Sequence, residues 1–285
     1  MFAQHRLTLG SIYRAFWRRI SLTWALTFIE TAFFALIPLF IGFAIDGLLE
    51  KSTRELFQLA GLMAALIFVA TLRRIYDTRV YGTIRVEAGG VLADRGGSLK
   101  VSALNARVAM GRELVDFMET TLPEAVAAAV QVVIAIAILF FFSPVFALAA
   151  AGAAILLAAI YALFHMRFYR LNGALNQQVE RQVDILDQRK ARSLRAHFLR
   201  LRRMEVRISD TEAILYGLIF VVLLGFILFN LHFAATTLTV TVGTIFSIIS
   251  YSWQFVESAL ALPITLQALS RLAEITERLN GEVQE

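Results

Sequence analysis

Six long apolar stretches divide this sequence, and each is close to the length that a helix needs to cross a lipid bilayer. The hydrocarbon core of a membrane is roughly 30 Å thick, so a crossing helix takes about 20 apolar residues. The stretches run over residues 21–48, 56–72, 122–142, 146–164, 214–231 and 239–266. Because 58% of the chain is hydrophobic and only 17% is charged, a water-soluble fold could not bury all of this apolar surface. We expect an all-α membrane protein with six transmembrane helices.

The remaining segments complete the expected domain organisation. Residues 1–20 mix aromatic side chains with arginines, a pattern typical of an elbow helix lying in the membrane interface. Residues 21–266 then form the transmembrane domain, with two long helical excursions from the membrane at 73–119 and 167–212. Residues 267–285 form a polar tail.

Two local features predict irregular helices within this plan. Pro38 lies inside the first span and is expected to kink it. The pairs Gly89–Gly90 and Gly96–Gly97 interrupt the first excursion, where a continuous helix is costly.

The distribution of basic residues predicts the orientation of the chain. Of the 27 lysines and arginines, only Lys51 and Arg54 lie in the turns on one side of the expected membrane. Since basic residues gather on the cytoplasmic side, both termini and both excursions should be cytoplasmic. The prediction is a multi-pass protein of the bacterial inner membrane. The orientation in the membrane therefore explains the net charge of +5, and we expect no nucleic-acid partner.

Four short motifs lie along the apolar segments. They are residues 38–46, with a proline followed by Ile-Gly and a hydrophobic-Asp pair; residues 76–81 with Arg85; residues 111–114, which read Gly-Arg-Glu-Leu; and residues 241–245 with Tyr251 and Pro263. In order and spacing these motifs resemble the six-helix transmembrane domain of ABC exporters, over nearly the whole chain.

This resemblance implies a homodimer in the bilayer that moves a solute by alternating access, powered by nucleotide-binding domains. A phosphate-binding loop needs a glycine directly before its lysine, yet none of the three lysines, Lys51, Lys100 and Lys190, follows a glycine. We therefore expect no ATP hydrolysis and no cofactor in this chain. ATP would act only through a separate ATPase subunit.

The resemblance also places a coupling surface for that ATPase on the two excursions. Its candidate residues are Asn105, Arg107, Arg112, Glu113, Arg189, Lys190 and Arg192. The second excursion departs from the family, because residues 187–194 lack the usual glycine and Ile-Lys pair. The ordinary docking surface is therefore altered here.

Ionisable residues inside a span point most directly to function, because a charge at the bilayer centre costs about 2.5–3.5 kcal/mol. Glu30 lies deep in the first span and Glu257 in the last, and Gln131 is a further buried polar group. We predict a substrate or proton pathway at these residues; beside Glu257 it would include Ser250, Tyr251, Trp253 and Gln254. The alternative is that each polar group only makes a hydrogen bond between helices.

Several functions fit this pattern. The first is the membrane subunit of an ABC-type transporter; the second is a stand-alone, proton-coupled transporter of a peptide-like solute on the same fold. A non-transporting membrane scaffold is a third, and an embedded enzyme ranks last because no catalytic constellation is found. The absence of cysteine excludes thiolate catalysis and cysteine metal sites. The sequence does not identify the solute.

Overall fold

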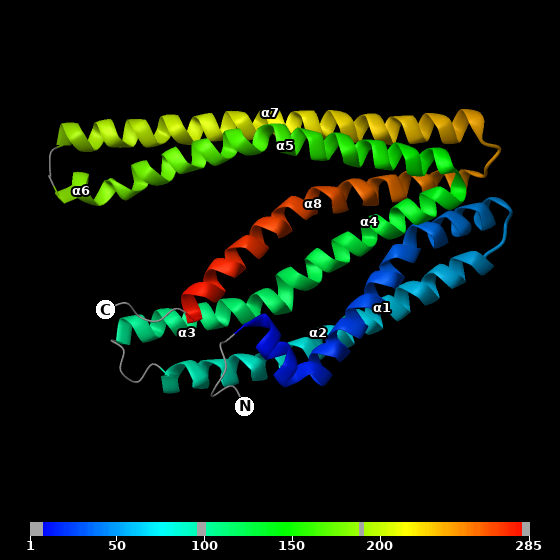
Figure 1. The fold of residues 1–285 in the computed structure, drawn as a ribbon. Coiled ribbons are helices and arrows are strands. Elements are labelled where there is room, and N and C mark those ends of the chain that lie inside the picture. Colours follow the sequence, from blue (N-terminus) through cyan, green and yellow to red (C-terminus); the bar gives the residue numbers. More distant parts are fainter. Residues whose placement is uncertain (1–7, 96–100, 188–190, 281–285) are drawn as a thin grey trace. The chain divides into compact units, whose positions relative to one another are not determined.

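Apart from short turns, the chain is helical in the residues that the structure describes. This computed structural model describes residues 8–95, 101–187 and 191–280, with most side chains before residue 262 (Figure 1). Its elements are α1 (Leu9–Leu49), α2 (Arg54–Arg95), α3 (Val101–Asp116), η1 (Phe117–Thr121), α4 (Leu122–Phe142), α5 (Pro144–Glu180), α6 (Gln182–Asp187), α7 (Ala191–Thr237) and α8 (Val242–Asn280). The expected all-α class is confirmed.

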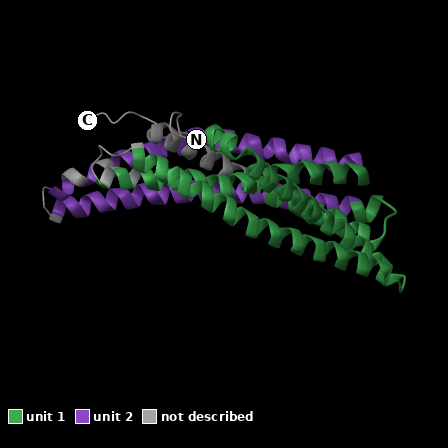
Figure 2. Ribbon diagram, turned by 90° about the horizontal axis from the view of Figure 1, so that it is seen from below, with its two compact units in different colours: residues 1–142, 234–285 green, residues 143–233 purple. Residues whose placement is uncertain are grey.

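Two compact units make up the fold (Figure 2). Unit 1 contains residues 1–142 and 234–285, and unit 2 contains residues 143–233. Within unit 1, α1 packs along α2, α4 and α8, and α4 packs along α8. The π-helical turn η1 joins α3 to α4 without a break, so a single long helix forms one side of this unit.

The expected elbow helix and first span form the single element α1. The helix begins with a capping box, in which Thr8 and Ser11 exchange hydrogen bonds of 3.2 and 2.9 Å. Phe16 has non-helical backbone angles (φ −118°, ψ 23°), so the bend lies four residues before the expected boundary at residue 20. Ile12 and Ile20, on either side of the bend, are both fully buried in the core cluster with residues of α2. Burial of these two side chains holds the bend in place.

One expected interruption is absent from the described helices. α1 keeps helical backbone angles through Pro38 and departs from them at Phe16, and the kink expected at Pro38 stays a prediction. α2 continues through Gly89–Gly90 to Arg95, where we expected a break. Two glycines cost a helix about 2 kcal/mol relative to alanine, but Ala88 and Leu92 beside them are buried in the core. Packing of these neighbours therefore keeps the helix continuous. The Gly96–Gly97 pair lies outside the described residues.

Two glycines let α1 and α8 approach within backbone contact. A Cβ atom on Gly243 would lie 1.9 Å from the carbonyl oxygen of Gly42, a distance that no side chain tolerates. One helical turn beyond Gly42, the Asp46 carboxylate accepts hydrogen bonds from the Gly243 N–H (2.8 Å) and the Thr241 hydroxyl (2.5 Å). Asp46 therefore satisfies a free N–H at the start of α8 and places its negative charge at the positive end of that helix.

Unit 2 is an antiparallel hairpin of α5 and α7. Ser143 caps α5 by accepting a hydrogen bond from the Val145 N–H (3.3 Å), and Pro144 occupies the first helical position. At one end of the hairpin Phe146 meets Phe233 edge to face, with ring centroids 5.4 Å apart. Near the other end the Gln178 amide donates to Nδ1 of His197 at 2.6 Å. The segment 167–212 is thus helical over most of its described residues, as predicted, and its two arms continue α5 and α7.

The number of membrane crossings is confirmed only in part. Among the described residues, five helices are long and apolar enough to span a bilayer: α1, α2, the continuous α3–η1–α4 helix, α5 and α7. α8 contains the sixth expected span but does not meet this criterion. Serines, Gln254 and Glu257 interrupt the apolar character of its described part.

Candidate functional site

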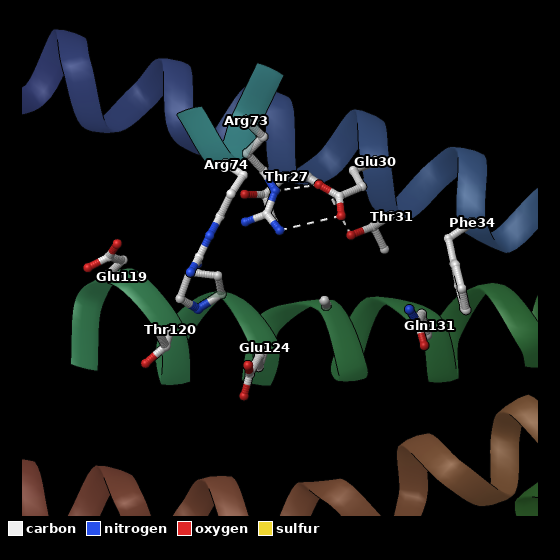
Figure 3. Close-up of a pocket in the computed structure, with 12 residues that line it drawn as sticks. Thr27, Glu30, Thr31, Phe34, Arg73, Arg74, Glu119, Thr120, Glu124 and Gln131 are labelled. Carbon is white, nitrogen blue, oxygen red and sulfur yellow. Dashed lines mark hydrogen bonds and ion pairs between the residues drawn. The ribbon is translucent and has the colours of Figure 1, made fainter. Parts of the chain in front are cut away.

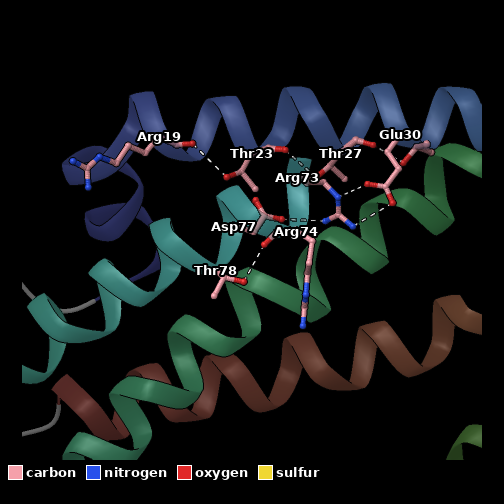
Figure 4. Close-up of polar contacts among 9 residues, drawn as sticks. Arg19, Thr23, Thr27, Glu30, Arg73, Arg74, Asp77 and Thr78 are labelled. Carbon is pink, nitrogen blue, oxygen red and sulfur yellow. Dashed lines mark hydrogen bonds and ion pairs between the residues drawn. The ribbon is translucent and has the colours of Figure 1, made fainter. Parts of the chain in front are cut away.

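A cluster of charged side chains joins α1 to α2 in unit 1 (Figure 4). The Arg73 guanidinium of α2 donates to both carboxylate oxygens of Glu30 on α1, through Nε to Oε2 and through Nη2 to Oε1 at 3.4 Å. Its Nη1 donates to Oδ2 of Asp77, one helical turn further along α2, at 3.2 Å. Glu30, which the sequence singled out as a lone charge in a span, is therefore paired.

The cluster has more acceptors than its own donors satisfy. Glu30 and Asp77 bring two carboxylates to one guanidinium, and the Asp77 side chain is only 4% exposed. Among the described residues, Oδ1 of Asp77 and the hydroxyl of Tyr81, one turn away, are buried without a hydrogen-bond partner of good geometry, although the Thr23 hydroxyl of α1 lies near the Asp77 carboxylate. Buried polar atoms are seldom left unpaired in folded proteins. The arrangement can therefore accept a proton, a water molecule or a donor group from a bound solute.

A polar pocket of about 270 Å³ opens beside this cluster (Figure 3). Helices α1, α2 and α4 line it together with the turn η1. The lining residues are Thr27, Glu30, Thr31, Phe34, Arg73, Arg74, Glu119, Thr120, Pro123, Glu124, Ala127 and Gln131. A hollow with several charged groups inside helices this apolar is typical of a solute site rather than of a packed core.

Two charged groups in the pocket are available to a ligand. Figure 3 shows the Arg74 side chain extending from α2 toward α4. Among the described residues, neither Arg74 nor Glu124 forms an ion pair or a side-chain hydrogen bond, and both are exposed. The pocket therefore offers one free cation and one free anion, whereas Arg73 and Glu30 beside them are held by each other.

The π-helical turn η1 shapes one wall of the pocket. Arg85 of α2 donates to Oδ1 of Asp116 through Nε at 2.7 Å, and its Nη2 also pairs with Glu119. These contacts hold the end of α3 and η1 against α2, and Glu119 itself lines the pocket. Single π-helical turns are frequent at functional sites.

Of the predicted pathway residues, Glu30 and Gln131 come together. Both line the pocket, Glu30 from α1 and Gln131 from α4. The Gln131 side-chain oxygen also accepts a hydrogen bond from the Ser258 hydroxyl of α8 at 3.3 Å. Gln131 therefore combines both roles that the sequence left open, as a bond between helices and as part of a polar cavity.

The five predicted residues of α8 lie on two faces of that helix. Tyr251 and Gln254 are buried, and the Tyr251 hydroxyl donates to the Ala35 carbonyl of α1 at 2.7 Å. Trp253 and Glu257 are exposed on another face, where the indole N–H donates to the Glu257 carboxylate at 2.7 Å. Ser250 is half-buried. None of the five lines the pocket beside Glu30, so Glu257 and Glu30 do not share one site in unit 1.

Comparison with known protein families gives a match that covers most of the chain. Residues 9–244 match the family described as the ABC transporter transmembrane region. This chain belongs to that family. A search of curated proteins finds no significant match.

The family motifs now have structural roles in this ABC transporter transmembrane region. Asp46 of the first motif binds the start of α8, and Arg85 of the second binds η1. Asp77, also in the second motif, contacts Arg73. The motifs therefore hold unit 1 together around the pocket.

The candidate coupling residues of this family member are distributed over both units. In unit 1, Asn105, Arg107, Arg112 and Glu113 all lie on α3, where Arg112 is 4.0 Å from Asp116. In unit 2, Arg192 is exposed near the start of α7. Arg189 and Lys190 lie outside the described residues.

Sequence reasoning missed four charged residues of the site. Arg73 and Glu119 served only as the bounds of the first excursion, Arg74 lies within that excursion, and Glu124, inside the third span, was not singled out. The position of these residues could have predicted the pocket, since charges near the ends of neighbouring spans can meet in one polar site. Among the described residues, no group of three or more His, Asp or Glu could hold a metal ion.

Proposed function

We propose that this chain is the membrane subunit of an ABC-type transporter, in which two copies form an alternating-access pathway driven by a separately encoded ATPase. Its family and its apolar helices support a transport role in the membrane. The chain has no Gly-Lys pair for a phosphate loop, so the ATPase activity is assigned to the partner subunit and the chain itself is not an enzyme.

The pocket between α1, α2 and α4 is the observation that carries this proposal. We assign it to the solute pathway, open to water on the cytoplasmic side. Within the part of the chain that the structure describes, Arg74 and Glu124 are its unpaired charges, so it suits a polar solute that carries an anionic group, a cationic group or both. Arg73 and Glu30 neutralise each other and form the floor of this pocket.

Copurification and transport together test the proposal. The tagged chain is purified from native membranes and reconstituted with any ATPase that accompanies it into vesicles loaded with a cell extract. Mass spectrometry then compares the vesicle contents with and without ATP. We expect an ATPase in the complex and at least one solute whose distribution depends on ATP. If no ATPase accompanies the chain and ATP changes no solute, the proposal is wrong.

Proton coupling is a second candidate, and the cluster at Asp77 favours it. Two carboxylates share one guanidinium there, and a buried carboxylate oxygen has no hydrogen-bond partner of good geometry among the described residues. Such an arrangement can take up a proton when the solute or the helices move. In vesicles with an imposed proton gradient and no ATP, this candidate predicts transport that a protonophore abolishes. It also predicts that Asp77→Asn uncouples transport from the gradient.

A further inference from the structure

The bend of α1 forms a second cavity, separate from the solute pocket. Its volume is about 400 Å³, and its wall consists of residues on both sides of Phe16 together with two residues of α2. The lining residues are Ala15, Phe16, Trp17, Arg18, Arg19, Thr83 and Glu87. The proposed transport function uses none of them.

The walls of this cavity are fixed in place. Ile12 and Ile20, on the opposite side of the bend, have no exposed surface and pack in the core cluster with Ile84 and Ala88 of α2. The Tyr13 hydroxyl also lies 3.3 Å from the Ser21 hydroxyl, across the bend. The helix segments that carry Arg18, Arg19 and Glu87 are therefore held together around the cavity.

The cavity carries opposite charges that no neighbouring side chain neutralises. Arg18 and Arg19 supply two guanidiniums, and Glu87 supplies a carboxylate. Within the described part of the chain, none of the three takes part in an ion pair, and all three side chains are exposed. The Arg18 guanidinium lies over the Trp17 ring, 5.4 Å from its centroid. This contact directs it along the cavity wall.

The surroundings of the cavity are those of a membrane surface. Trp17 is 53% exposed and Tyr13 is 44% exposed, and aromatic residues of this kind gather at the level of lipid headgroups. A helix that mixes exposed aromatic residues with arginines lies in the interface with its apolar side chains toward the acyl chains. A lipid headgroup is therefore the ligand that the position of this cavity favours.

We propose that this cavity binds the headgroup of an aminophospholipid, a lipid with a phosphodiester and a primary ammonium. The phosphodiester oxygens pair with Arg18 and Arg19, since guanidinium groups match phosphate geometry well. The ammonium donates hydrogen bonds to the Glu87 carboxylate. A quaternary ammonium has no N–H to donate, and a headgroup without a cation leaves Glu87 facing an anion. The cavity thus selects phosphatidylethanolamine over phosphatidylcholine and phosphatidylglycerol.

Native mass spectrometry of the purified full chain in detergent tests this proposal. The probes are these three lipids with identical acyl chains, added singly and in competition. The wild-type chain should retain phosphatidylethanolamine about 3- to 5-fold better than either competitor, as expected for exposed charge pairs. Glu87→Gln should remove this preference and leave phosphatidylglycerol bound equally well. The double variant Arg18→Gln/Arg19→Gln should weaken binding of both lipids.

A matched control uses Arg14→Gln, because Arg14 is an exposed arginine of the same helix that does not line the cavity. This variant should bind all three lipids as the wild type does, and circular dichroism checks that every variant is folded. The proposal is overturned if the wild type shows no preference for phosphatidylethanolamine. It is equally overturned if folded Glu87→Gln keeps the preference, or if Arg14→Gln weakens binding as much as the double variant does.

Discussion

Glu30 and Arg73, which lie 43 residues apart in the sequence, pair through two hydrogen bonds between α1 and α2. Each side chain is 25% exposed, so this ion pair lies at the edge of the polar pocket rather than on an open surface. It neutralises the charge that made Glu30 conspicuous in the first span. The neighbouring Arg74 has no such partner, and the two arginines therefore have different roles.

Exchange of each arginine for glutamine should separate these roles. Arg73→Gln leaves Glu30 and Asp77 as two neighbouring carboxylates without their cation. We therefore expect the free energy of unfolding to fall by about 1–3 kcal/mol, a value between those typical of exposed and of fully buried ion pairs. Arg74→Gln removes an unpaired, exposed charge and should change stability by less than about 0.5 kcal/mol. Thermal unfolding in the same detergent measures both. Equal losses for the two variants would contradict these assignments.

The close contact of α1 with α8 gives a prediction about packing. Gly243→Ala would place a methyl group 1.9 Å from the Gly42 carbonyl, so the helices must separate, at a cost of about 1–3 kcal/mol. Gly61→Ala is the matched control, because no atom lies within 4 Å of the added Cβ there. It should leave stability unchanged or raise it by up to about 1 kcal/mol. A denaturant titration followed by circular dichroism would show the difference; a stable Gly243→Ala variant would refute the close contact.

The hairpin of unit 2 depends on its buried polar pair. Gln178 and His197 are 6% and 2% exposed and are joined by a 2.6 Å hydrogen bond. Gln178→Ala should therefore destabilise the hairpin by about 1–3 kcal/mol, because it leaves the His197 ring buried without this partner. Gln177→Ala, at the exposed neighbouring position, should have little effect. Limited trypsin digestion, which cleaves at the arginines of α7, reports local opening. Similar digestion rates for both variants would be contrary to expectation.

Much of the helical plan could be predicted from composition and spacing alone. Apolar length located five of the six expected spans, and helical periodicity beyond the apolar stretches predicted the long helices α2, α5 and α7. The end of the elbow was placed at residue 20, whereas the structure bends at Phe16. The cause is tertiary, since burial of Ile12 and Ile20 against α2 determines where the helix must turn.

The site was harder to predict than the fold, because it is built from contacts between distant segments. Glu30 and Gln131 stand out in sequence as polar residues within apolar spans, and both line the pocket. Nothing in the local sequence shows that Arg73 reaches back across 43 residues to Glu30. The π-helical turn at Phe117–Thr121 was not predicted either, although Pro123 follows it closely and has no N–H to donate to the Glu119 carbonyl.

Thiol accessibility in membrane vesicles tests most directly whether the pocket is a water-filled part of a solute pathway. The chain has no cysteine, so a single introduced thiol reacts without background. Ala127→Cys places it in the pocket, and Phe141→Cys places it at a position that is 86% exposed on an apolar stretch of α4. With a membrane-impermeant thiol reagent, we predict rapid labelling of the Ala127→Cys variant in inside-out vesicles and little labelling of the Phe141→Cys variant. If the Ala127→Cys variant stays unlabelled there, or reacts only in right-side-out vesicles, the pocket is not a cytoplasm-facing pathway.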